Sequence, residues 1–101
     1  MKHLLYLREE AEQDLEEARQ WYEKRSAGLG AEFIDIVRLQ IQKIVDFPES
    51  FNLCHASVRG VTMPRFPYVI YYQVLPDMVE VLAVVHARRS AKSWKQRLSK
   101  N

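Results

Sequence analysis

The hydrophobic period of the chain changes at Pro48, and this change constrains the fold more than any other feature of the sequence. Before Pro48, apolar residues recur every three or four positions, as they do on one face of a helix. After Pro48, short runs are rich in β-branched and aromatic residues, which favours strands. Helices followed by strands, rather than alternating with them, are typical of an α+β fold.

The half before Pro48 contains two helical patterns separated by glycines. A first helix is predicted over residues 8–25, with the apolar stripe Ala11, Leu15, Ala18, Trp21 and Tyr22. A second is predicted over residues 31–46. Gly28 and Gly30 indicate a helix end and a tight reversal between them. We therefore expect an antiparallel helical hairpin, preceded by a short strand over residues 3–7.

Three strands are predicted in the second half, over residues 57–63, 68–74 and 79–86. Their short connections favour an antiparallel meander. Ser90 is placed to cap a short last helix, with Trp94 and Leu98 on one face and Trp94 filling the core. The expected fold is α+β: an N-terminal strand, an antiparallel helical hairpin, a three-stranded antiparallel meander and a short C-terminal helix. One domain is expected to span residues 1–101.

Composition indicates an ordinary globular protein, because 48% of the 101 residues are hydrophobic and 28% are charged. The single cysteine, Cys54, excludes an internal disulfide and fits a reducing compartment. The apolar run at the N-terminus is too short for a signal peptide, and no run approaches the length of a membrane span. We therefore expect a cytoplasmic protein with no membrane partner.

Charge is divided unevenly along the chain. Residues 1–50 contain seven basic and eleven acidic residues, a net charge of −4. Residues 51–101 contain eight basic and two acidic residues, a net charge of +6. This division suggests that the second half is built for an anionic partner, either nucleic acid or an acidic protein segment, although an uneven mixed-charge surface gives the same numbers.

No motif for a metal, a phosphate loop or a nucleophile elbow is present, so we expect neither metal nor cofactor. His55 beside Cys54 is weak support for a catalytic thiol. What remains is a set of basic residues that is predicted to bind an anion or a partner: Arg59, Arg65, His86, Arg88, Arg89 and Lys92. For the arginines and Lys92, the alternative is ordinary surface charge. For His86, it is a polar strand end that a backbone carbonyl satisfies.

The alternation of side chains along the last predicted strand predicts which face of the sheet carries His86. Period-two geometry puts Val81, Ala83, Val85 and Ala87 on one face, and this uniformly apolar set suits packing against the helices. His86 and Arg88 belong to the other face and are predicted to point away from the helices. A slip of one residue would reverse this assignment.

Several segments follow one another in an order and spacing that is typical of a known family: 10–15, 21–22, 28–33, 47–48, 58–59, 65–72, 81–89 and 94–97. In these segments the chain resembles the RelE/ParE superfamily of type II toxin–antitoxin toxins, which are also described as plasmid stabilisation proteins. The resemblance covers nearly the whole chain and looks closer to the ParE-like branch. It implies a toxin that a cognate antitoxin neutralises by covering its sheet and basic groove.

The resemblance leaves the cellular target open between two branches. ParE-like members inhibit DNA gyrase and are not enzymes. RelE-like members cleave mRNA on the ribosome, where His86 and Arg88 would be catalytic. No lysine occurs in residues 50–64 and no tyrosine follows Tyr72, which departs from the RelE-type pattern and favours the gyrase-directed reading. A non-toxic member that only binds its partner is a third reading.

Overall fold

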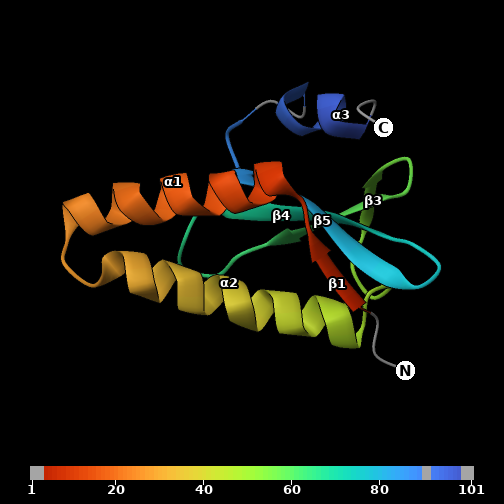
Figure 1. The fold of residues 1–101 in the computed structure, drawn as a ribbon, viewed down its shortest axis with the longest axis horizontal. Coiled ribbons are helices and arrows are strands. Elements are labelled where there is room, and N and C mark those ends of the chain that lie inside the picture. Colours follow the sequence, from red (N-terminus) through yellow and green to blue (C-terminus); the bar gives the residue numbers. More distant parts are fainter. Residues whose placement is uncertain (1–3, 90–91, 99–101) are drawn as a thin grey trace.

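The computed structural model describes residues 4–89 and 92–98 (Figure 1). Its elements, in chain order, are β1 (Leu4–Leu7), α1 (Glu9–Arg25), α2 (Leu29–Asp46), β2 (Leu53–His55), β3 (Val58–Thr62), β4 (Tyr68–Val74), β5 (Met78–His86) and α3 (Lys92–Leu98). The mixed α+β order that the sequence predicts is therefore confirmed. The predicted cap at Ser90 and the predicted strand residue His3 lie outside the described residues.

The helical hairpin forms as the two glycines predict. Acidic residues occupy the first turn of α1 and basic residues its last turn, which suits the helix dipole. Gly28 has a positive φ of 88°, and α2 begins at Leu29, two residues before the predicted start. The Glu23 carboxylate accepts hydrogen bonds from the backbone N–H groups of Gly28 and Gly30, at 2.9 and 3.0 Å. This carboxylate ties the end of α1 to the start of α2.

The five strands form one sheet in the order β1-β5-β4-β3-β2. The predicted antiparallel meander is confirmed for β3, β4 and β5. It is extended by β2, a three-residue edge strand that the sequence does not predict. β1 joins the other edge and runs parallel to β5, with Leu4 opposite Met78 and Leu7 opposite Val81. Cys54 lies in β2.

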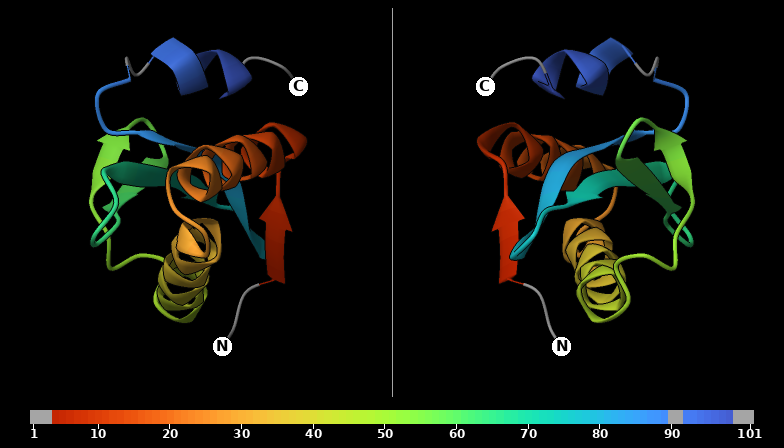
Figure 2. Two further views of the ribbon diagram at one scale, coloured as in Figure 1. Left: turned by 90° about the vertical axis from the view of Figure 1, so that its left-hand side faces the viewer. Right: turned by 90° about the vertical axis from the view of Figure 1, so that its right-hand side faces the viewer.

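The sheet has two hydrophobic cores, one with the helical hairpin and one with α3. Figure 2 shows how the backbones of these helices lie around the sheet. On one face, buried residues of α1 and α2, including Tyr22, Phe33 and Ile44, pack against β3, β4 and β5. On the other face, Trp94 of α3 packs against Val58, Leu82, Ala83 and Val85. Trp94 is only 1% exposed and stacks on Tyr71 with ring centroids 4.5 Å apart. The prediction that Trp94 fills a core is thus confirmed.

In the described part of the chain, no helix has the length and apolar character needed to cross a membrane.

Candidate functional site

A β-bulge in β5 determines which way the end of this strand faces. Tyr71 pairs with Ala83 and Tyr72 pairs with Val81, so Leu82 is an extra residue with no opposite partner on β4. The alternation of side chains therefore shifts by one residue at this point. Val79, Val81 and Val84 lie in the core beneath the helical hairpin (the hairpin core), whereas Leu82, Ala83 and Val85 lie in the core beneath α3 (the α3 core).

The prediction that His86 points away from the helices is therefore wrong. Simple alternation holds as far as Val81, but the bulge turns Ala83 and Val85 away from the hairpin and His86 toward it. The His86 ring lies edge-on to Tyr68, with centroids 5.5 Å apart, and Tyr68 packs against the hairpin core. Arg88 lies in the turn beyond the strand, where strand alternation no longer applies.

The turn after β5 is fixed by three backbone donors. The N–H of Ala87 donates to the carbonyl of Pro67 at 2.8 Å, and the N–H of Arg89 donates to the carbonyl of His86 at 2.9 Å. The N–H of Arg88 donates to Nδ1 of His86 at 3.1 Å. Because Nδ1 accepts, a neutral His86 carries its proton on Nε2. The turn thus presents two exposed guanidinium side chains, Arg88 and Arg89, from a backbone that is held in place.

A groove of about 490 Å³ opens beside this turn, between α1, the start of β4 and the end of β5. Tyr22, Tyr68 and Val84 contribute aromatic and aliphatic surface to it. Trp21 lies at the groove and is 50% exposed, with the Arg25 guanidinium 4.1 Å from its ring centroid. Such a concave, largely apolar site with a few polar groups is suited to binding a ligand or a partner side chain.

Acidic residues and the cation Arg89 lie on opposite sides of the groove. Asp14 and Glu17 of α1 line one side, and His86 and Arg89 line the side formed by the end of β5. Burial raises the pKa of the Tyr68 hydroxyl, and the nearby Arg89 acts in the opposite direction. A carboxylate that entered the groove would therefore be attracted to its β5 side.

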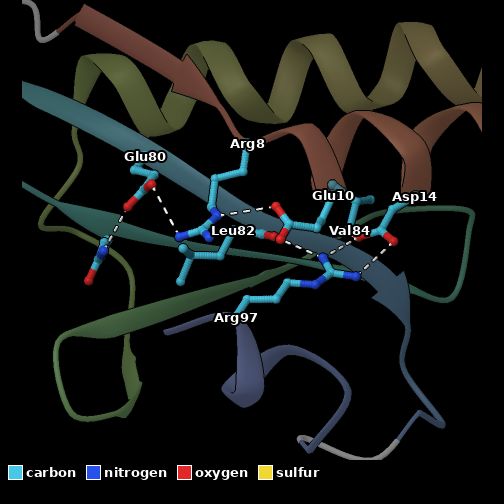
Figure 3. Close-up of polar contacts among 8 residues, drawn as sticks. Arg8, Glu10, Asp14, Glu80, Leu82, Val84 and Arg97 are labelled. Carbon is cyan, nitrogen blue, oxygen red and sulfur yellow. Dashed lines mark hydrogen bonds and ion pairs between the residues drawn. The ribbon is translucent and has the colours of Figure 1, made fainter. Parts of the chain in front are cut away.

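Asp14 and Arg97 bind one another across the edge of β5 (Figure 3). The two guanidinium nitrogens of Arg97 donate to the Asp14 carboxylate at 2.7 and 3.1 Å, and Nη1 also donates to the Leu82 carbonyl at 2.9 Å. The carboxylate accepts the N–H of Val84 at 3.0 Å. Strand β1 pairs with β5 only as far as Val81, so these side chains satisfy backbone groups along the continuation of that edge, while β4 pairs with the other edge of β5.

The other predicted basic residues bind elsewhere. Arg59 donates to the Phe51 carbonyl at 2.6 Å and holds the segment after α2 against β3. Arg65, whose φ is 69°, forms an ion pair with Glu32 of α2 at 2.8 Å. The side chain of Lys92 lies outside the described residues. Of the predicted set, the structure brings together His86, Arg88 and Arg89, which are also neighbours in sequence.

The sequence prediction missed most of the groove, including Asp14 and Trp21. Asp14 lies on the same helical stripe as Ala11 and Ala18, and a charged residue on a buried stripe indicates a buried partner. Trp21 was assigned to the apolar stripe together with Tyr22, but in the structure Tyr22 is buried and Trp21 is half exposed. The partner of Asp14, Arg97, is 83 residues away in sequence and could not be identified locally.

Among the described residues, no group of three or more histidine, cysteine or carboxylate side chains is arranged to hold a metal ion. Burial raises the pKa of the Cys54 thiol, which disfavours the nucleophilic thiolate, and its Sγ lies 3.5 Å from the Val58 carbonyl oxygen, to which it donates. The arrangement at the groove is one of aromatic surface and fixed charge, which suits binding.

Comparisons with known proteins agree with this fold. Residues 5–91 match the family described as the ParE toxin of the type II toxin–antitoxin system parDE. No curated protein matches the chain by sequence. One solved structure, described as the chromosomal ParDE TA system from P. aeruginosa, has a TM-score of 0.73 and 16% identity, covering 84% of this chain and 96% of that one. A free-state variant of the E. coli toxin RelE has a TM-score of 0.65 and 18% identity, covering 97% and 99%.

These two structures are too distant in sequence to show more than the fold, but the family match covers most of the chain. It includes the helical hairpin, β3, β4, β5 and the basic turn after β5. The resemblance to the RelE/ParE superfamily, and to its ParE-like branch, is therefore confirmed. The chain belongs to the ParE toxin family of type II toxin–antitoxin systems.

Proposed function

We propose that this ParE-family toxin inhibits DNA gyrase and is neutralised by a cognate antitoxin. The observation that carries the proposal is the match of residues 5–91 to the ParE toxin family. The description of the P. aeruginosa structure as a ParDE toxin–antitoxin system supports an antitoxin as partner. The toxin would act as a single domain in the cytoplasm, where gyrase works, and the system would serve plasmid stabilisation.

The basic turn of β5 supports a binding role for this toxin. Arg88 and Arg89 are exposed, and among the described residues neither side chain has a carboxylate partner. Exposed, unpaired guanidinium groups on a fixed backbone are suited to a carboxylate or phosphate on another molecule. Arg59 and Arg65, which are engaged within the chain, are weaker members of the same predicted surface.

Supercoiling and cleavage assays with purified gyrase test the proposed target. We expect the protein at micromolar excess to block supercoiling and to raise the amount of cleaved DNA. Addition of the antitoxin from the reading frame beside the toxin gene should restore supercoiling. No effect on gyrase at that excess would contradict the proposed target, whereas growth arrest on expression would still support a toxin.

Cleavage of mRNA on the ribosome is the alternative function, in which His86 and Arg88 are the proposed catalytic residues. The likeness to the E. coli RelE fold over nearly the whole chain is the observation in its favour. Primer extension on mRNA in a translating extract should then show cuts that disappear with His86→Ala or Arg88→Ala. Normal growth on expression of folded protein would instead favour a non-toxic member that only binds its partner.

A further inference from the structure

We propose that the open edge of β1 is an interface between two copies of this chain, in which the two β1 strands pair antiparallel across a two-fold axis. Strand β1 is an outer strand of the sheet, and β5 is its one partner among the described strands. Figure 2 shows β1 at the margin of the sheet, with no other described element beyond it. A second copy is the occupant that this edge favours, because its donors, acceptors and apolar side chains complement themselves.

Three consecutive side chains of β1 are large, apolar and exposed. Leu4, Leu5 and Tyr6 are 69%, 45% and 50% exposed, and the strand contains no charge, proline or bulge. Natural proteins use such features to protect an open edge from pairing with other strands. The opposite edge of the sheet is better protected, since β2 has three residues and its pairing with β3 is irregular between Leu53 and His55. The edge of β1 is therefore the one suited to pairing.

The hydrogen bonds of β1 determine which of its backbone groups are open. The N–H of Arg8 donates to the Val81 carbonyl at 3.1 Å, so the backbone groups of alternate residues, Tyr6 among them, also point toward β5. The N–H and C=O groups of Leu5 and Leu7 therefore point outward. One antiparallel register pairs all of them: Leu5 lies opposite Leu7 of the second copy, and the two residues exchange both hydrogen bonds. The two-fold axis repeats this pair.

The same register places Tyr6 opposite Tyr6 of the second copy, beside the two-fold axis. The side chains of such a non-hydrogen-bonded pair lie close together, which favours two aromatic rings. Arg8, at the end of the interface, adds no unbalanced charge, because its guanidinium lies 3.4 Å from the Glu10 carboxylate and 3.5 Å from that of Glu80 (Figure 3). None of the four residues of β1 lines the groove beside β5, so the interface and the groove are separate surfaces.

Sedimentation velocity of the free toxin tests the association. A four-residue strand buries less than the roughly 800 Å² per partner of a stable interface, so we expect a dissociation constant on the order of 10–100 µM. Leu5→Pro removes an outward N–H and none that β5 accepts, a position where edge strands tolerate proline. This variant should stay monomeric where the wild type dimerises. The control Leu39→Ala, which removes a leucine that is 60% exposed on α2, should dimerise like the wild type.

Disulfide trapping measures the register. Tyr6→Cys and Leu4→Cys are made separately in a Cys54→Ser background, which removes the native thiol. Opposite Cα atoms at position 6, about 4.5 Å apart, can carry a disulfide, whereas the two copies of position 4 would lie more than about 10 Å apart. Leu4 is the matched control, because it lies on the same face of β1 as Tyr6 and is more exposed. We expect a covalent dimer to form from position 6 at least about tenfold faster than from position 4.

The outcomes separate edge pairing from general stickiness. Equal disulfide rates at the two positions, a wild-type toxin that sediments as a monomer at a concentration of several hundred micromolar, or a Leu5→Pro variant that unfolds like the wild type and still dimerises would each overturn the proposal. If Leu5→Pro does not fold, the two disulfide rates decide the matter. A monomeric toxin that still inhibits gyrase would overturn the edge pairing alone.

Discussion

Tyr72 joins the centre of the sheet to the segment that follows α2. Its side chain is fully buried in β4, and its hydroxyl donates a hydrogen bond to the carbonyl oxygen of Pro48. Tyr72→Phe removes the donor and leaves a buried carbonyl without its partner, which should reduce the free energy of unfolding by about 1–2 kcal/mol. Urea denaturation measures this change. The control Tyr71→Phe should have a smaller effect, since no hydrogen bond of the Tyr71 hydroxyl is found among the described contacts; equal losses would contradict the assigned role.

The same hydroxyl makes stability depend on alkaline pH. Burial raises the pKa of Tyr72 from its ordinary value of 10 to about 12, so the folded protein keeps this proton at a pH where the unfolded chain loses it. This contribution is fully present below the unfolded value and is lost as the pH rises through the folded value. We therefore expect the free energy of unfolding to fall between about pH 10 and pH 12. Denaturation curves across this range should show a shallower fall for Tyr72→Phe than for the wild type, and parallel falls would contradict the assignment.

At the scale of elements, the close contact of the two hairpin helices depends on Gly30. A Cβ atom added there would lie 2.7 Å from the backbone carbonyl oxygen of Arg19, closer than such atoms approach in proteins. Helix propensity alone predicts that Gly30→Ala stabilises the protein by about 1 kcal/mol. We expect the opposite sign, a loss of about 1–3 kcal/mol, because the helices must move apart. Thermal or urea unfolding gives the sign directly, and a stabilised Gly30→Ala would show that the hairpin tolerates the shift.

The attachment of α3 depends on a buried ion pair. The side chains of Arg97 and Asp14 are 13% and 8% exposed, and together they also satisfy the Leu82 carbonyl and the Val84 N–H. Asp14→Ala removes the carboxylate that balances the buried charge of Arg97 and leaves the N–H of Val84 without its acceptor, which should cost about 3–5 kcal/mol. The matched control breaks the exposed Glu16–Arg19 pair with Arg19→Met and should have little effect. Urea denaturation with both variants tests this, and similar small losses would mean that α3 is held by Trp94 packing instead.

The sequence predicts the elements whose patterns are local and misses those that depend on distant pairing. The bounds predicted for β4, residues 68–74, agree with the structure, because that run is uniformly aromatic and β-branched. β2 has three exposed residues and therefore no alternating pattern to recognise. The bulge at Leu82 arises from how β5 pairs with β4, so the sequence of β5 alone could not indicate it. This single residue reverses the predicted direction of His86, and the groove beside His86 was missed with it.

At the scale of the whole molecule, the uneven charge along the chain becomes an uneven charge in space. The acidic half forms the helical hairpin, whereas Arg88 and Arg89 lie at the end of β5. With a net charge of only +2, electrostatic attraction of an acidic partner depends on this distribution more than on the total. The hairpin would weakly repel such a partner, and the basic turn would attract it.

This distribution predicts how antitoxin association responds to salt. Raising NaCl from about 0.05 M to about 0.5 M shortens the range of electrostatic attraction, so the association rate constant should fall by about tenfold while the dissociation rate changes less. Replacing both Arg88 and Arg89 with glutamine should flatten this dependence, because the attracting charges are removed. The double variant Arg38→Gln/Lys43→Gln removes the same charge from exposed positions of α2 and should keep the wild-type dependence. Stopped-flow or surface-plasmon measurements supply the rates, and equal salt dependences for the two double variants would show that attraction follows the total charge and not the basic turn of β5.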